Sequence, residues 1–212
     1  MEKNRCKWCN MHNSLYIKYH DEEWCQPQFD DKYLLEMLIL ESFQAGLSWE
    51  CVLNKREDFR KAYDDFDIDK ICKFDENKIN ELISNEKIIR NKLKIKASIN
   101  NAKIFKNIQN EYGTFHNYLK TFTQDKTVYE TDKTTSNLSD KISKDLQQKG
   151  MKFVGSTIIY SYLQAIGVIY SHDEECFLYK NTEVKNAIYS VIKRNKHNPK
   201  KQNSNGRVKK RI

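Results

Sequence analysis

His172 and Cys176 are four residues apart, a spacing that places both side chains on one face of a helical turn. Imidazole nitrogen and thiolate sulfur are both zinc ligands, and a structural zinc site takes four ligands. Cys6 and His20, near the other end of the chain, can supply the remaining two if the two ends meet in the fold. Cys9 can take part instead, because Cys6 and Cys9 have the C-x2-C spacing of many zinc sites. Spacing alone leaves both sets open, together with the simpler interpretation of scattered thiols and surface imidazoles.

A second group of residues with chemical potential lies in and near the segment LESFQAGLSW, residues 40–49. Glu41 stands at the end of an apolar helical pattern, and Trp49 follows a glycine-containing turn. A carboxylate beside an indole can bind a flat cationic ring, because the ring stacks on the indole and its N–H groups donate to the carboxylate. Tyr16 and Tyr19 can add stacking surface or hydroxyl contacts. The alternative interpretation is a glutamate at a helix end and a tryptophan in the core.

Basic residues are concentrated in the segment SNEKIIRNKLKIK, residues 84–96. Backbone N–H groups at a helix N-terminus bind phosphate oxygens without reading base sequence, and flanking cations strengthen the contact. The segment therefore predicts a contact with phosphate groups, with a solvated basic face as the alternative. Its cations are Lys87, Arg90, Lys92, Lys94 and Lys96.

Helices are expected to position these residues, because prolines and glycines are few and apolar residues recur at spacings of three and four. Asp30 or Asp31 can cap the first long helix, which Gly46 ends, and Asp75 can cap the first helix of a helix-hairpin-helix outline. Residues 124–136 are polar and predict a loop. The helices are expected over residues 30–45, 48–59, 68–72, 75–83, 93–105, 138–149 and 153–170, of which the last is expected to be the most buried.

The 212 residues are enough for one well-buried core or for two small lobes that share an interface. Hydrophobic residues make up 39% and charged residues 31%, which is the balance of a globular chain and not of a disordered one. No stretch is apolar over the ~18 residues that span a bilayer, and the first residues lack the apolar run of a signal peptide. We therefore expect an intracellular protein, cytoplasmic or, in a eukaryote, nuclear, with no membrane partner.

The net charge of +8 comes from the last part of the sequence. Residues 184–212 contain ten of the 37 Lys and Arg residues and no Asp or Glu, which leaves 27 basic against 29 acidic residues in the rest. A DNA-binding face outside this segment must therefore come from local clustering and not from overall charge. The segment has few apolar residues and is expected to be a basic, disordered tail.

Three segments, taken in order, resemble the 3-methyladenine DNA glycosylase I family. They are a cysteine followed by LYIKYHDEEW, the central LLEMLILESFQAGLSWECVLNKRE, and the late KFVGSTIIYSYLQAIGVIYSHDEEC, and together they span residues 5–176. The resemblance implies an all-α, helix-hairpin-helix glycosylase-like fold with a zinc-stapled lobe formed by the N- and C-terminal segments. We expect one glycosylase domain of two lobes over residues 1–183, followed by the tail over residues 184–212.

The resemblance also implies the site residues. One structural Zn²⁺ would be bound by Cys6, His20, His172 and Cys176, without Cys9. Glu41 would be the catalytic residue that recognises the extruded base, in a pocket with Tyr16, Tyr19, Trp49 and Gln44. The wider superfamily uses a catalytic aspartate, which this family is thought to lack. Because 3-methyladenine in DNA is cationic and a good leaving group, extrusion and selective binding can suffice.

The implied activity is excision of 3-methyladenine from alkylated double-stranded DNA by hydrolysis of the N-glycosidic bond, as in base excision repair. The implied enzyme is a monomer that releases free 3-methyladenine. Two positions depart from the family pattern. Lys87 stands where many members have glycine, and Cys25, which follows Trp24, also stands where glycine is usual.

Two other functions are compatible with the residues. One is a non-catalytic zinc-containing protein that recognises alkylated DNA. The other is a cysteine-nucleophile hydrolase that pairs one of the six thiols with His116 or His172. Disulfides are not expected, because nothing in the sequence indicates secretion.

Overall fold

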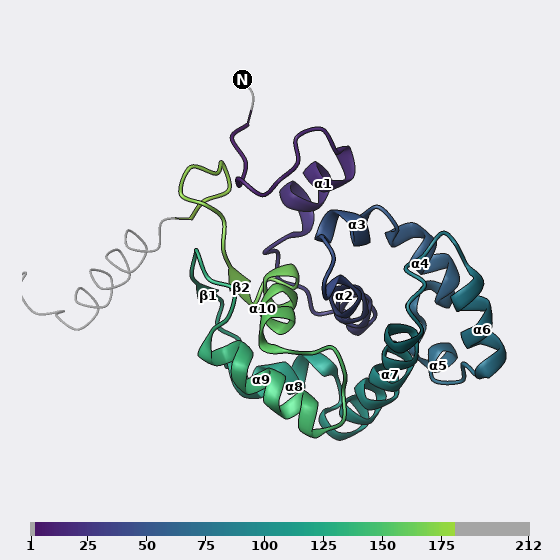
Figure 1. Cartoon of the computed structure of the whole chain (residues 1–212). Coiled ribbons are helices and arrows are strands. Elements are labelled where there is room, and N and C mark those ends of the chain that lie inside the picture. Colours follow the sequence, from purple (N-terminus) through teal and green to yellow (C-terminus); the bar gives the residue numbers. More distant parts are fainter. Residues whose placement is uncertain (1–2, 181–212) are drawn as a thin grey trace, which may run out of the picture.

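The computed structural model describes residues 3–180, and the tail expected over residues 184–212 lies outside them. Figure 1 shows α2 (Asp31–Gln44) in the middle of the fold, with other helices arranged around it. The fold is mostly helical, as predicted. The other helical segments are α1 (Ser14–Lys18), a one-turn π-helix η1 (Tyr19–Glu23), α3 (Trp49–Leu53), α4 (Arg56–Ala62), a 3-10 turn η2 (Asp64–Phe66), α5 (Ile68–Ile71), α6 (Glu76–Ser84), α7 (Lys92–Tyr112), α8 (Phe115–Thr123), α9 (Asn137–Gln148) and α10 (Ser156–Ala165).

The central helix α2 is buried on all sides. Every side chain from Leu34 to Phe43 is buried, because apolar residues occupy the whole circumference of the helix and not a single stripe. Its start is capped by Asp30, whose carboxylate accepts a hydrogen bond from the Tyr33 N–H, as expected from the sequence. This helix, and not the one predicted over residues 153–170, is the most buried of the described chain.

The prediction of one helix over residues 48–59 is wrong in one respect, because the segment forms two helices, α3 and α4, that are separated at Lys55. The break gives the two halves different directions. Trp49 at the start of α3 is buried, and Arg56 at the start of α4 donates to Glu23 at 2.6 Å and to Glu36 at 2.8 Å.

The helix expected over residues 153–170 is shorter than predicted. It covers only α10, because Phe153 before it and Gly167 after it have positive φ angles of 55° and 74°. The segment after α10 forms a short strand, β2 (Ile169–Tyr170), which pairs in parallel with β1 (Val128–Tyr129) from the segment predicted to be a loop. Strands of two residues carry too little pattern to be recognised from sequence.

The helix-hairpin-helix outline is confirmed by α6 and α7. Asp75 caps α6 through a hydrogen bond from the Lys78 N–H, and Asn91 caps α7 through one from the Lys94 N–H.

Among the described residues, no helix combines the length and the apolar character that a membrane crossing needs.

The N- and C-terminal parts of the described chain are joined by main-chain hydrogen bonds. Phe177 N–H donates to the Asn4 carbonyl at 2.8 Å, and Cys25 N–H donates to the Gln164 carbonyl at 2.9 Å. Cys25 has a φ of 63°, which explains why glycine suits this position. Gly167 lies directly against Gln26, so closely that an added Cβ would be 2.3 Å from a main-chain carbon.

Candidate functional site

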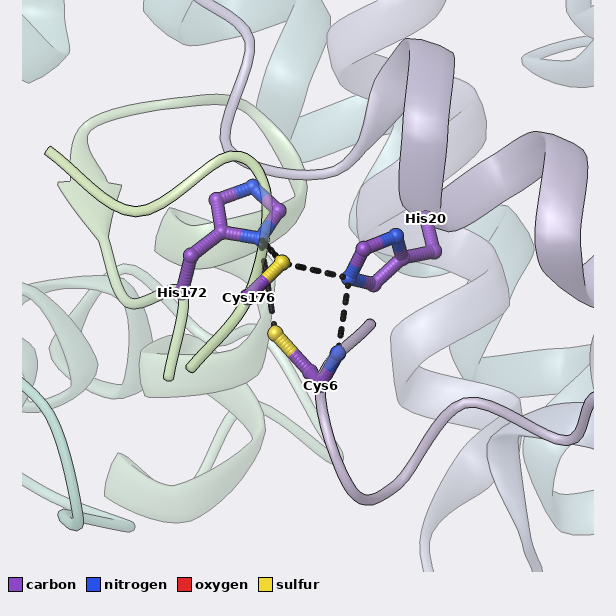
Figure 2. Close-up of side chains that lie close together, drawn as sticks. All are labelled: Cys6, His20, His172 and Cys176. Atoms are coloured by element: carbon purple, nitrogen blue, oxygen red, sulfur yellow. Dashed lines mark hydrogen bonds between the residues drawn. The ribbon is translucent and has the colours of Figure 1, made fainter. Parts of the chain in front are cut away.

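Two cysteines and two histidines from opposite ends of the chain meet in one place (Figure 2). Their ligand atoms all lie within 4.8 Å of one another. Cys6 Sγ is 3.4 Å from His172 Nδ1, and Cys176 Sγ is 3.5 Å from both His172 Nδ1 and His20 Nε2. In a tetrahedral zinc site with bonds of about 2.1 and 2.3 Å, neighbouring N and S ligands are about 3.6 Å apart. The group therefore has the dimensions of a metal site.

His20 is oriented by an acidic neighbour. It lies in the π-helix η1, and its Nδ1 is 2.8 Å from the Asp21 carboxylate, which leaves Nε2 for the group. Arg5 donates to both oxygens of the same carboxylate, at 2.8 and 2.7 Å. Burial opposes ionisation of Asp21, but the hydrogen bonds from Arg5 and His20 outweigh it and hold its pKa below the ordinary value. A carboxylate behind a ligand histidine is the usual arrangement in zinc proteins.

All four members of the group are buried. Burial, followed by the nearby His20, lowers the pKa of His172 to about 4, so the imidazole is neutral at physiological pH and offers its lone pair. Burial raises the pKa of the Cys6 thiol, which needs a nearby cation to ionise. A divalent metal supplies that charge, because coordination deprotonates a thiol. The residues present therefore fit a metal ion.

Cys9 does not belong to this group. Its Sγ faces the main-chain carbonyl of Tyr16 at 3.9 Å. Of the two ligand sets left open by spacing, the structure assembles the one with His20. The group also argues against a cysteine-nucleophile hydrolase, because a nucleophile needs a lowered thiol pKa and burial raises the pKa of Cys6 and Cys9. The other candidate base, His116, lies beside Asp125, 3.4 Å from Nε2 to the carboxylate.

A cavity of about 310 Å³ lies beside the metal-type group. All five residues that the sequence suggested for a base pocket line it: Tyr16, Tyr19, Glu41, Gln44 and Trp49. Tyr19 and His20 are consecutive, so η1 directs one side chain to the cavity and the next to the cysteines. The rings of Tyr19 and Trp49 are 5.3 Å apart between centres and inclined by 49°. The cavity therefore has aromatic walls at which a flat ring can stack.

Three polar atoms of residues that line the cavity have no hydrogen-bond partner among residues 3–180. They are Glu41 Oε2, Gln44 Oε1 and Trp49 Nε1, and each is buried. Buried polar groups are nearly always paired, so an unpaired set in one cavity indicates groups that await a ligand or water. Burial raises the pKa of Glu41 well above its usual range, and in the described part of the chain no cation opposes this shift. Burial therefore disfavours the ionised form of this carboxyl.

Comparison with known proteins agrees with this site. The sequence model of the methyladenine glycosylase family matches residues 8–179. The chain belongs to the methyladenine glycosylase family. DNA-3-methyladenine glycosylase 1 of Escherichia coli strain K12 is 40% identical to it over 182 residues, which cover 82% of this chain and 96% of that protein.

Two solved structures show the same fold as this member of the methyladenine glycosylase family. A crystal structure of 3-methyladenine DNA glycosylase I matches with a TM-score of 0.80 and 37% identity, covering 84% of this chain and 100% of that chain. A tyrosine-to-phenylalanine variant of 3-methyladenine DNA glycosylase I in complex with 3-methyladenine matches with a TM-score of 0.79 and 30% identity, covering 84% and 98%.

The basic hairpin of this methyladenine glycosylase family member lies between α6 and α7. Lys87, Arg90 and Lys92 are exposed there. The Lys87 N–H donates to Asn85 Oδ1 at 3.0 Å, and Arg90 pairs with Glu86 at 3.2 Å. Lys87 does not have a positive φ, so the backbone at this position does not require the glycine of many family members.

Lys94 differs from the other hairpin cations. It is only 7% exposed, and its Nζ donates to the main-chain carbonyls of Phe43 and Ala45. The ammonium is therefore already engaged with main-chain carbonyl groups of the protein, whereas the other three cations of the hairpin are exposed. The sequence could not reveal this, because α2 and α7 are brought together only by the tertiary fold.

Several cavity residues were not predicted. Ser161 and Gln164 are polar positions three residues apart in the apolar α10, a pattern that could have indicated a lining face. Trp24 lies within a motif shared with the family. The full set of unpredicted lining residues is Trp8, Trp24, Asp132, Lys133, Ser161, Gln164, Ser171 and Asp173.

Proposed function

We propose that this chain is a 3-methyladenine DNA glycosylase I that excises 3-methyladenine from alkylated double-stranded DNA in base excision repair. The observation that carries the proposal is the unpaired Glu41 carboxyl in a cavity whose walls include Trp49 and Tyr19. A cationic ligand gains more from this carboxyl than a neutral or anionic one, because only a cation adds a charge interaction with the carboxylate. A flat cationic base offers the carboxyl both a positive charge and N–H donors, which are the partners that Glu41 lacks.

Glu41 recognises the extruded base through its charge. Burial raises the pKa of the Glu41 carboxyl and so disfavours its charge, whereas a cationic base beside it would stabilise the carboxylate form. The base stacks between aromatic side chains, and the free Gln44 Oε1 and Trp49 Nε1 can hydrogen-bond to it or to its water. Recognition thus combines stacking with charge-assisted hydrogen bonding.

The chemistry needs little further assistance from the protein. Positive charge on 3-methyladenine weakens the N-glycosidic bond, so the base leaves with the bonding electron pair and water adds to the sugar carbon. Interactions that strengthen as the bond breaks lower the barrier. In this scheme Glu41 is the catalytic residue and Tyr16, Tyr19, Gln44 and Trp49 form the base-binding pocket.

We further propose that the metal of the buried group is one Zn²⁺. Two sulfur and two imidazole ligands with tetrahedral dimensions support zinc, and four protein ligands leave no open position for catalysis. The ion would supply the charge that ionises the two thiols and would join the chain's two ends. Its role is therefore structural.

Phosphate contacts are proposed for Lys87, Arg90 and Lys92 at the hairpin. Their exposure and their place at the start of α7 support this, since a helix N-terminus and nearby cations bind phosphate. The expected partner is the backbone of double-stranded DNA.

The test is incubation of the zinc-loaded full chain with methylated duplex DNA, followed by chromatographic identification of the released bases. We expect release of 3-methyladenine with little 7-methylguanine, and a strongly reduced rate for Glu41→Gln. Binding to the methylated duplex without release of any base would favour the non-catalytic alternative.

A further inference from the structure

The last turn of α2 carries two cavity residues, Glu41 and Gln44. Its main-chain carbonyl groups need partners from outside the helix, because no further turn follows. The chain leaves the helix at Ala45, where φ and ψ are −47° and 112°, and then turns towards Trp49. The main chain around Gln44 therefore determines how three cavity side chains are directed.

Lys94 provides hydrogen bonds to this part of the main chain. Its Nζ donates to the Phe43 carbonyl at 2.8 Å and to the Ala45 carbonyl at 2.5 Å, the residues on either side of Gln44. The ammonium also lies 6.0 Å from the centre of the Phe153 ring. A cation at this place additionally complements the negative end of the α2 dipole.

Lys94 belongs to the first turn of α7, directly after the basic hairpin. Its own N–H donates to Asn91, the cap of that helix, at 3.1 Å. One residue thus connects the hairpin to the end of the helix that carries Glu41. Burying an ammonium among carbonyl groups costs free energy, and burial accordingly lowers the pKa of Lys94. The two hydrogen bonds to the carbonyl groups at the end of α2 offset this cost and fix the ammonium there.

We propose that Lys94 is a positioning residue for base recognition, which holds Gln44 and Glu41 in the arrangement that the extruded base requires. The inference rests on the proposed function. It replaces the direct phosphate contact that the sequence suggested for Lys94. It also makes the shape of the base cavity depend on the hairpin that faces DNA.

The two roles of Lys94 are distinguished by the free base, which has no phosphate. Lys94→Met keeps the apolar stem and removes the donor. We expect its affinity for free 3-methyladenine, measured by calorimetry, and its single-turnover excision rate to fall at least about tenfold, as when a hydrogen bond to a charged group is lost. Its affinity for undamaged duplex DNA, and the dependence of that affinity on salt, should stay within about twofold of wild type.

Three variants serve as controls. Lys55→Met removes a similar bond, from Nζ to the Lys87 carbonyl at 3.0 Å, which does not touch α2, and should leave free-base affinity unchanged. Ile71→Ala, a buried change in α5, shows whether lower stability by itself weakens base binding. Lys94→Arg retains a cation but shifts its donors, so it should recover part of the lost affinity and not all of it.

Normal affinity of folded Lys94→Met for the free base would overturn the inference. So would a loss confined to duplex binding, with a salt slope reduced by about one, because that result identifies a phosphate contact. If wild type releases no 3-methyladenine, the proposed function fails instead. If Lys94→Met does not fold, the comparison of Lys94→Arg with wild type decides, since shifted donors should lower free-base affinity more than duplex affinity.

Discussion

Tyr19 and His20 are adjacent in the chain, yet Tyr19 lines the base cavity and His20 belongs to the buried cysteine and histidine group. Successive side chains on a helical turn point in different directions, so η1 directs these two buried side chains to different sites. The metal-type group and the cavity therefore share one short segment of main chain.

Loss of the metal should consequently weaken base binding as well as stability. Cys176→Ser is expected to lower zinc content and to lower Tm by roughly 10 °C, the effect of about 3 kcal/mol in a domain of this size. Its affinity for free 3-methyladenine should fall in parallel. Metal analysis, thermal unfolding and calorimetry provide the three measurements. Cys9→Ser is the matched control and should change none of them; full zinc retention in Cys176→Ser would exclude the proposed ligand set.

Glu41→Gln should preserve the fold and the zinc but lose much of the recognition. A neutral amide is a weaker acceptor and points a donor at the base, so the loss should be on the order of 1.5 to 3 kcal/mol, or roughly 10- to 150-fold. Glu41→Ala should be at least as severe. Single-turnover excision by zinc-loaded variants with wild-type circular dichroism measures the effect. Wild-type rates in Glu41→Gln would remove this residue from the site.

The same substitution should stabilise the free protein at neutral pH. Burial raises the pKa of Glu41 above its ordinary value of 4.5, so the folded state keeps a proton that the unfolded chain releases. As pH rises from the unfolded pKa towards the higher folded pKa, wild type therefore loses stability. Glutamine has no such proton, and Glu41→Gln should be more stable by about 1 to 3 kcal/mol at neutral pH. The difference in Tm should shrink as pH approaches 4.5; a constant difference would show that the carboxyl is already ionised.

Gly167→Ala should be strongly destabilising. Its Cβ would lie 2.3 Å from main-chain atoms of Gln26 and Pro27, which cannot move without breaking the contact between the two ends of the fold. We expect a loss of at least about 3 kcal/mol in denaturant unfolding. Gly155→Ala is the control, because a Cβ there meets nothing within 4 Å, and its cost should stay near or below about 1 kcal/mol.

Removal of residues 184–212 should affect DNA affinity more than chemistry. The ten cations of this segment can release counterions from DNA, so the truncated protein should bind duplex DNA more weakly and with a flatter dependence on salt. Single-turnover excision at saturating enzyme and low salt should remain intact. Abolished excision under those conditions would make the segment part of the active structure.

Local sequence signals predicted the helices whose ends are fixed by neighbouring residues. Asp30 and Asp75 cap α2 and α6 as expected, because a cap depends on a few adjacent residues. The break at Lys55 was not predicted, since no proline or glycine marks it in the sequence.

The residues of the candidate site were also predicted only in part from the sequence. Glu41 and Trp49 stood out by type and spacing, and both line the cavity. Sequence spacing could not decide whether Cys9 or His20 is the fourth ligand. The answer depends on whether the Cys9 thiol or the His20 imidazole faces His172 and Cys176 in the folded chain. The engagement of Lys94 with α2 was hidden for the same reason.

The meeting of Cys6 with His172, which are 166 residues apart, also sets an order for biosynthesis. A ribosome releases Cys6 and His20 long before His172 and Cys176, so the early pair must wait for nearly the whole described chain before the group can close. A nascent or prematurely terminated chain that stops before His172 cannot complete it. Because Tyr19 adjoins His20, such a chain also lacks a fixed wall of the cavity. An incomplete chain therefore has no complete pocket in which to bind an extruded base.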